Sequence, residues 1–167
     1  GFNTVRVAEF AWCFFEPEEG RFDFSWLDKA LALLDEAGIQ VILGTPTATI
    51  PAWMAARYPE VMALGDDGRR RRFGVRKDYC LSSPDFDRLA MRAVAQIARH
   101  YARDRRVMAF QTDNEFGCHE TTRTWGEMSR QGFQQWLQER YDDLDALNQA
   151  WGAVFWSQEY GDWAEIG

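Results

Sequence analysis

Three short β-like runs alternate with longer segments whose apolar residues recur at helical spacing. The runs cover 4–10 (TVRVAEF), 40–46 (QVILGTP) and 107–115 (VMAFQTDNE). β-Branched and aromatic residues bounded by Gly, Pro and Asp are typical of strands. The second run is almost continuously apolar, as in strands that are buried on both faces of a parallel sheet. The pattern therefore predicts three strands of one sheet.

The segment between the first two runs predicts an amphipathic helix. Its apolar residues at helical spacing are Leu27, Ala30, Leu31 and Leu34. We expect Ser25 to cap this helix and Gly38 to end it, because a short polar side chain and a glycine are common at those two positions.

Two further helices are predicted before the third run. A short one lies within 50–61, set off by Pro51 and ending before Pro59. A long one covers 86–104, with Asp85 as its cap. One face of the long helix carries Leu89, Ala93, Ile97 and Tyr101 at steps of four.

The last part of the chain predicts two helices. One spans 127–141 with Phe133, Trp136 and Leu137 on its inner face, and a shorter one covers 144–152. We find no internal repeat, low-complexity tract or Ser/Gly linker in the sequence. The chain is expected to form one piece.

The order of the elements predicts the fold class. Alternating strands and helices imply parallel strands with right-handed crossovers, in a doubly wound sheet or in part of a (β/α)8 barrel. A nucleotide-binding unit would show G-x-G-x-x-G after the first strand, whereas EFAWCFFEPEEG stands there. A full barrel needs about 250 residues. We therefore expect an α/β fold that is a fragment of a (β/α)8 TIM barrel, and a chain that starts within a domain.

Composition narrows the classes of partner. The net charge is −7 and the pI is about 4.9. The one basic run, 69–72, is expected to be a solvated loop. Nucleic acids and anionic membranes are therefore poor partners for this chain. We find no run of eighteen apolar residues that could span a bilayer and no signal peptide at the start of the sequence.

The cysteines and aromatic residues indicate the compartment and a class of ligand. Cys13, Cys80 and Cys118 are far apart in the sequence, which predicts neither a disulfide framework nor a zinc ribbon, and a reducing compartment is the default. Aromatic residues make up 15% of the chain and include eight Trp. Core packing explains most of them, but the excess suits a carbohydrate site, where a sugar face packs on an indole.

Polar residues follow the predicted strands. In a barrel, residues at the carboxyl ends of the strands face the active site. Glu9, Thr45, Pro46, Asn114 and Glu115 would then lie on one rim. A glutamic acid there can protonate a departing glycosidic oxygen, and a neighbouring Asn amide can bind the substrate 2-hydroxyl. Alone, the NE pair is a weak signal, because this dipeptide is common in ordinary turns.

Four longer segments give that pair a context. RVAEFAWCFFEPEEGRFDFSWLD, ILGTPTATIPAWM, QTDNEFGCH and ALNQAWGAVFWSQ, in this order, resemble the β-galactosidases of glycoside hydrolase family 42, and the resemblance runs through residues 1–167. It implies a retaining enzyme on a (β/α)8 barrel, with an acid/base glutamate after strand four and a nucleophile after strand seven. Residues 1–167 would then be a fragment of the catalytic domain, roughly strands two to four with their helices.

The resemblance also implies site residues and partners. Glu115 matches the acid/base, Asn114 its preceding asparagine, Arg76 a substrate-binding arginine, and Trp156 a tryptophan that lines the galactose pocket. No cofactor is implied, and the expected partner is a β-galactoside. The resemblance also implies a cytoplasmic, oligomeric parent enzyme, with a homotrimer as the expected state. The alternatives are a related retaining glycosidase acting on an arabinoside or fucoside, and a sugar-binding or structural fragment.

The sequence departs from the family in two respects. The nucleophile has no counterpart within 1–167, and a retaining enzyme needs two carboxyl groups about 5 to 5.5 Å apart. We therefore expect the isolated chain to be inactive. Many family members also hold a structural zinc with four cysteines. Here Cys80 matches the first, but Thr124, Gly126 and Ser129 stand at the other three positions, so we expect no zinc.

Two other groups of residues are candidates for a functional role: the adjacent Cys118 and His119, and Glu9. Cys118 and His119 are adjacent, but two ligands are too few for a metal, and we expect none there. Glu9 fits a supporting carboxylate at the rim and a salt-bridge partner of a nearby arginine equally well.

Overall fold

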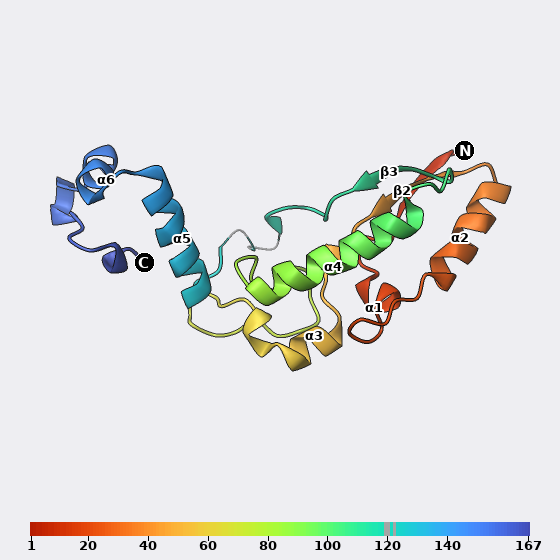
Figure 1. The fold of residues 1–167 in the computed structure, drawn as a ribbon, viewed down its shortest axis with the longest axis horizontal. Coiled ribbons are helices and arrows are strands. Elements are labelled where there is room, and N and C mark those ends of the chain that lie inside the picture. Colours follow the sequence, from red (N-terminus) through yellow and green to blue (C-terminus); the bar gives the residue numbers. More distant parts are fainter. Residues whose placement is uncertain (119–120, 122) are drawn as a thin grey trace.

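Three parallel strands form the sheet of this protein. The computed structural model describes residues 1–118, 121 and 123–167. The strands are β1 (Thr4–Val7), β2 (Gln40–Gly44) and β3 (Val107–Gln111), hydrogen-bonded in the order β1-β2-β3 (Figure 1). The predicted parallel α/β arrangement is confirmed, although all three strands are shorter than expected.

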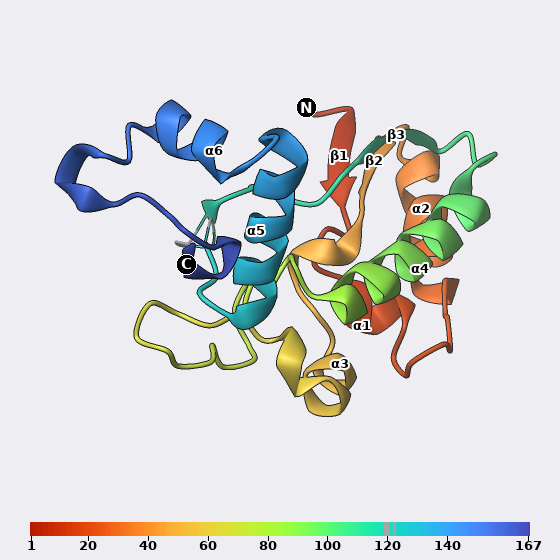
Figure 2. The same ribbon diagram turned by 60° about the vertical axis from the view of Figure 1, so that its left-hand side comes forward.

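Two long helices cover the same face of the sheet. Figure 2 shows α2 (Ser25–Glu36) and α4 (Pro84–Tyr101) side by side there. The fully buried side chains between sheet and helices include Leu27, Leu31, Val41, Leu43, Ile97 and Tyr101. Burying one such aliphatic side chain contributes about 1.5–3 kcal/mol. On β2, Val41 and Leu43 are buried against the helices whereas Ile42 is half-buried, so this strand is not buried on both faces within the chain.

The helix starts differ from the predicted caps. The N-cap of α2 is Phe24, and the Ser25 N–H donates to Asp23 Oδ1 at 2.9 Å. The N-cap of α4 is Ser83, whose Oγ accepts from the Phe86 N–H at 3.3 Å. The predictions of Ser25 and Asp85 as caps were wrong. Pro84 explains the second error, because proline suits the first helical position and moves the cap to the residue before it.

The helix end at Gly38 is confirmed. Gly38 has a φ of +68°, and its N–H donates to the Asp35 carbonyl at 2.9 Å. Glycine adopts this left-handed conformation without the steric cost that other residues incur.

Short helices connect the strands to the covering layer. They are α1 (Trp12–Phe15), η1 (Pro46–Ala48), α3 (Ala52–Arg57) and η2 (Pro59–Val61). The limits of α3 at Pro51 and Pro59 are as predicted, whereas α1 was not predicted. Its four residues are too few to show a helical period.

A buried ion pair ties α1 to α4. The Glu16 carboxylate is fully buried, pairs with Arg92 and accepts from Trp12 Nε1 at 2.9 Å. The main-chain carbonyl of Glu16 also accepts a hydrogen bond from Trp53 Nε1 at 2.8 Å. This part of the molecule thus combines apolar packing with one internal charge pair.

The basic run forms an exposed loop between α3 and α4. Arg69, Arg70 and Arg72 are exposed, and Arg70 pairs with Glu60. The solvated-loop prediction for this run is confirmed.

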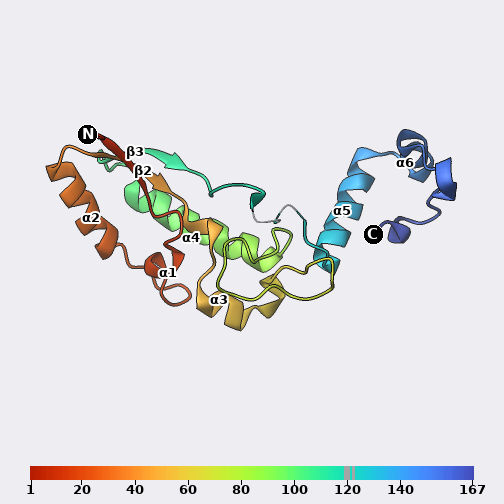
Figure 3. The ribbon, with the colours of Figure 1, turned by 180° about the vertical axis from the view of Figure 1, so that it is seen from behind.

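The remaining helices lie at the other end of an elongated molecule. They are α5 (Glu127–Arg140), α6 (Leu144–Trp151), η4 (Phe155–Ser157) and η5 (Trp163–Glu165) (Figures 1 and 3). Leu137 is buried with Leu147 and Ile166, as expected of an inner-face residue. Phe133 and Trp136 are 41% and 50% exposed, so their placement on the inner face was wrong. They stack on each other instead, with ring centroids 6.1 Å apart.

None of the described helices is long and apolar enough to cross a bilayer.

Candidate active site

The carboxyl ends of the three strands meet at one edge of the sheet. Glu9 follows β1, Thr45 follows β2, and Asn114 follows β3. Gly44 allows these segments to approach, because a Cβ on it would lie only 2.8 Å from Glu9 Cβ. The Thr45 N–H donates to the Gln111 carbonyl at 2.8 Å. The predicted rim of polar residues is therefore formed, and it also contains Pro46, the first residue of η1.

Glu115 and Arg76 meet above this rim. Arg76 Nη1 donates to Glu115 Oε2 at 2.5 Å, although the two residues are 39 positions apart. The Glu115 side chain is 53% exposed, so its carboxylate is accessible to a ligand. The Arg76 guanidinium also lies over the ring of Phe10, 5.7 Å from its centroid, which is a cation–π contact. The structure thus brings together two of the four residues that the sequence selected.

Asn114 is the buried neighbour of Glu115. Its Oδ1 accepts from Gln111 Nε2 at 3.3 Å, and Gln111 Oε1 in turn accepts from Arg6 Nη1 at 2.9 Å. Arg6 Nε also pairs with Glu9 Oε1 at 3.1 Å. Glu9 is therefore the salt-bridge partner of an arginine, as one of its two readings predicted. This chain of hydrogen bonds fixes the Asn114 amide relative to the sheet.

A second ion pair lies beneath the first. Lys77 pairs with Asp113, whose Oδ2 also accepts from Thr47 Oγ1 at 3.0 Å. Sequence reasoning missed both charged residues. The available signal was adjacency, because Lys77 follows Arg76 and Asp113 precedes Asn114.

Burial shifts the acidity of the groups around this pair. Desolvation raises the pKa of the Tyr79 hydroxyl, and the nearby Asp113 carboxylate raises it further. Tyr79 therefore stays a hydrogen-bond donor, and it donates to the Thr47 carbonyl at 2.6 Å. Desolvation likewise raises the pKa of Asp78, whose Oδ2 accepts from the Gly74 N–H at 3.0 Å. The layer below Glu115 is thus polar, buried and closely hydrogen-bonded.

The structure does not bring Trp156 to this site. Trp156 belongs to η4, which follows α6, and the segment around α6 lies at the opposite end of the molecule from the strands (Figure 3). It is 79% exposed, has a φ of +67° and contacts Phe155 edge to face. Its predicted role at the sugar pocket stays a prediction.

The four positions aligned with the family's zinc cysteines do come together. Cys80 Sγ lies 3.3 Å from both Thr124 Oγ1 and Ser129 Oγ, and the two hydroxyls hydrogen-bond to each other. A Cβ on Gly126 would lie 3.3 Å from Leu64 Cδ1, and glycine itself supplies no ligand. One thiol and two hydroxyls do not fit the closed thiolate or imidazole set of a structural zinc. The donor set argues against zinc, as the sequence predicted.

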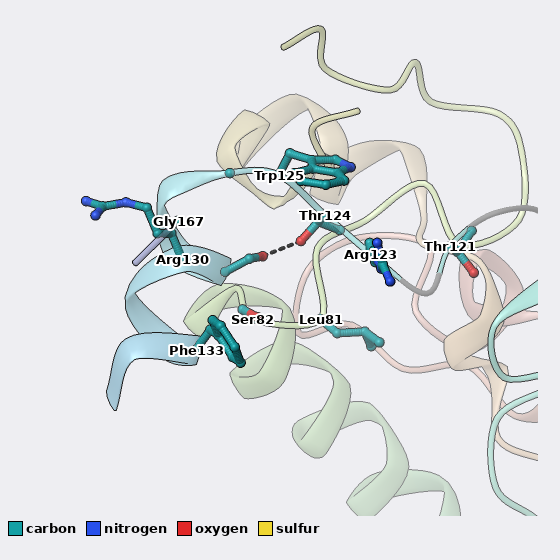
Figure 4. A pocket seen from close by; sticks show the side chains of 11 residues that line it. Leu81, Ser82, Thr121, Arg123, Thr124, Trp125, Arg130, Phe133 and Gly167 are labelled. Carbon is teal, nitrogen blue, oxygen red and sulfur yellow. Dashed lines mark hydrogen bonds between the residues drawn. The ribbon is translucent and has the colours of Figure 1, made fainter. Parts of the chain in front are cut away.

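A hollow of about 630 Å³ adjoins this thiol–hydroxyl cluster, lined by Leu81, Trp125, Phe133 and other side chains (Figure 4). Glu115 and Arg76 are not among its described lining residues, so it is separate from the candidate site.

The expectation of no metal at Cys118 and His119 stays a prediction. His119 lies outside the described residues. Cys118 is half-buried, and its N–H donates to the Glu115 carbonyl at 3.1 Å. Across the described residues, no three His, Cys, Asp or Glu side chains are placed to hold a metal ion.

Comparisons with known proteins agree along the whole chain. The model of glycoside hydrolase family 42, described as beta-galactosidase, matches residues 1–167. A beta-galactosidase of Thermus thermophilus is 49% identical over 99% of this chain, which spans 26% of that protein. The chain thus spans about a quarter of the length of the curated relatives it matches.

Solved structures show the same likeness. The beta-galactosidase of the Antarctic haloarchaeon Halorubrum lacusprofundi superposes with a TM-score of 0.93 at 45% identity, over 99% of this chain and 25% of that one. The psychrophilic Marinomonas ef1 beta-galactosidase also gives 0.93, at 43% identity. These neighbours confirm the predicted partial TIM-barrel fold.

Proposed function

This chain belongs to glycoside hydrolase family 42, and from that premise we propose that it forms the part of a retaining β-galactosidase that carries the acid/base, Glu115. The parent enzyme is then a protein of its relatives' length that contains residues 1–167, roughly as strands two to four of the catalytic barrel. The observation that carries the proposal is the accessible Glu115 carboxylate at the carboxyl edge of the sheet, paired with Arg76.

Glu115 has two tasks in the proposed reaction. In the first step it gives its proton to the glycosidic oxygen as the bond from that oxygen to the sugar C1 breaks, while the nucleophile carboxylate bonds to C1. In the second step Glu115 takes a proton from water, whose oxygen attacks C1 and displaces the nucleophile. The nucleophile comes from the parent enzyme outside residues 1–167.

Arg76 and Asn114 supply binding in this scheme. The Arg76 N–H now donates to Glu115 Oε2, whereas the acid must present a protonated oxygen to the leaving group. Oε1 is then the oxygen of Glu115 that carries the proton to the leaving group, and further N–H groups of the Arg76 guanidinium donate to substrate hydroxyls. The Asn114 amide, fixed through Gln111, binds the 2-hydroxyl, a contact that strengthens in the transition state.

Several finer properties belong to the same proposal. The substrate is a terminal β-D-galactoside, Trp156 lines its pocket, and the parent is a cytoplasmic homotrimer. A panel of nitrophenyl glycosides separates galactoside from arabinoside or fucoside preference. The purified 167-residue chain should turn over none of them, because one carboxyl group cannot do the work of two.

The decisive variant is Glu115→Gln in the parent enzyme. It keeps the side-chain shape but removes the proton, so kcat for p-nitrophenyl β-galactoside should fall by about 10²–10⁴-fold while galactose still binds. Glu127→Gln is the matched control, since Glu127 is a similarly exposed carboxylate, 58% accessible, paired with Arg130 on α5. Unaltered activity in Glu115→Gln would refute the assignment. Galactose binding without any turnover by the wild-type parent would favour a sugar-binding module.

A further inference from the structure

Two ion pairs link the same two loops, one above the other. Arg76 and Lys77 are adjacent on the first loop, and Asp113 and Glu115 are two apart on the second. The upper pair, Arg76–Glu115, is partly exposed, with side chains 34% and 53% accessible. The lower pair, Lys77–Asp113, is nearly buried, at 7% and 12%. The proposed reaction uses the upper pair and leaves the lower pair without a role.

Asp113 is held by contacts on both carboxylate oxygens. Its Oδ1 pairs with Lys77 and accepts from the Asn114 N–H at 2.5 Å, and its Oδ2 accepts from Thr47 Oγ1. Its own N–H donates to Thr45 Oγ1 at 2.7 Å, and its carbonyl accepts from Gln111 Nε2 at 2.7 Å. The carboxylate is thus committed to the protein and is not available to a substrate.

These contacts hold the backbone in an uncommon conformation. Asp113 has a φ of +55° and Glu115 one of +47°, in the left-handed region that non-glycine residues rarely adopt. Such conformations persist where the surroundings impose them. The hydrogen bonds at Asp113 therefore determine the direction in which the chain presents Glu115, two residues later.

Lys77 is anchored in the same way on the opposite loop. It is buried, has a φ of +53°, and its N–H donates to the Ala48 carbonyl at 3.0 Å. Its ammonium group also lies 5.1 Å from the centroid of the Phe116 ring. Fixing Lys77 fixes the peptide that carries Arg76.

We propose that the buried Lys77–Asp113 pair is the positioning device of this site: it sets the distance and direction at which Arg76 and Glu115 face the substrate. This inference rests on the proposed function of Glu115. A displacement of about 1 Å at a catalytic group can lower the rate by about 10²-fold. Lys77 and Asp113 act through their neighbours and are positioning residues.

The test uses the parent enzyme and the dependence of kcat/KM on the leaving group. Dinitrophenol leaves without a proton, whereas an alkyl alcohol needs one, so a misplaced acid shows only with the second. Lys77→Met and Asp113→Asn should each lower kcat/KM for an alkyl β-galactoside by about 10²-fold more than for the dinitrophenyl β-galactoside. The double variant should lose no more than the worse single one, because the two residues act as a unit.

Glu16→Gln is the matched control. Like Asp113→Asn, it neutralises the buried carboxylate of an ion pair, but this pair is formed with Arg92 in the α1–α4 layer. It should lower the melting temperature and leave the ratio between the two substrates unchanged. Asp113→Asn keeps the side-chain shape and serves as the test should Lys77→Met not fold.

The outcomes separate the two proposals. Equal losses on both substrates, as expected of Glu16→Gln, or unchanged activity in Lys77→Met and Asp113→Asn, would overturn the positioning role. Should Glu115→Gln itself show no greater loss on the alkyl galactoside, the proposed function fails. If Glu115→Gln loses activity steeply on the alkyl galactoside while Lys77→Met and Asp113→Asn do not, only the positioning role is overturned.

Discussion

The layer between sheet and helices and the rim of the sheet are held together by different interactions. In the covering layer, apolar side chains such as Leu31 of α2 and Leu43 of β2 are fully buried. At the rim, ion pairs and hydrogen bonds join loops that are far apart in the sequence, as between Lys77 and Asp113. Apolar packing is non-directional, whereas hydrogen bonds fix orientation. The first region therefore supplies stability and the second supplies geometry.

Removing apolar volume from the covering layer should have the largest effect on stability. Leu31→Ala in the parent enzyme should lower the free energy of unfolding by about 2–5 kcal/mol, through lost burial and the cavity left behind. Leu33→Ala on the same helix is the control, because Leu33 is 67% exposed. Denaturant unfolding measures both, and folded Leu31→Ala should keep its kcat. A loss of kcat without a loss of stability would break the division between the two regions.

Removing one amide at the rim should have the opposite pattern: a loss of activity with little loss of stability. Asn114→Ala should lower kcat/KM for the β-galactoside by about 10²-fold, the order found when one transition-state hydrogen-bond donor is lost. A 2-deoxygalactoside provides the control, since it lacks the hydroxyl that we assign to Asn114. Wild type and Asn114→Ala should differ little on that substrate. An equal loss on both substrates would show that Asn114 acts through structure and not through the 2-hydroxyl.

Metal removal should have no effect at the thiol–hydroxyl cluster of Cys80, Thr124 and Ser129. A chelator should leave the melting temperature of the parent unchanged, because the cluster is joined by hydrogen bonds and lacks a zinc ligand set. A structural zinc contributes about 10–16 kcal/mol of binding free energy, so its loss would be plain in a melting curve. Changing Thr124, Gly126 and Ser129 together to Cys should create the chelator sensitivity that the wild type lacks. Sensitivity in the wild type would contradict our reading of the cluster.

The covering layer could be predicted from the sequence because its interactions repeat along the chain. Leu89, Ala93, Ile97 and Tyr101 recur every four residues, and all four are buried in α4. Cap positions were harder to predict, since Ser83 and Asp85 are both good capping residues and only the position of Pro84 decides between them. On α5, the spacing of Phe133, Trp136 and Leu137 predicted a helix correctly, but of these three residues only Leu137 is buried.

The rim could be predicted only in part. Strand ends and family resemblance selected Glu115, Asn114 and Arg76, whereas the pairing of Lys77 with Asp113 joins residues 36 apart and leaves no periodic signal. The roles of Arg6 and Gln111 depend on strand order, because their side chains meet across β2. Contacts of this kind follow from the assembled sheet and not from local pattern.

The most direct test of Glu115 as the acid/base is azide rescue of Glu115→Ala in the parent enzyme. Removing the carboxylate leaves the second step without a base, and azide is a nucleophile that needs none. With dinitrophenyl β-galactoside we predict that azide restores turnover and that the product is β-galactosyl azide, with Glu127→Ala unaffected by azide. An unrescued variant, or one that forms only galactose in azide, would contradict the assignment of Glu115.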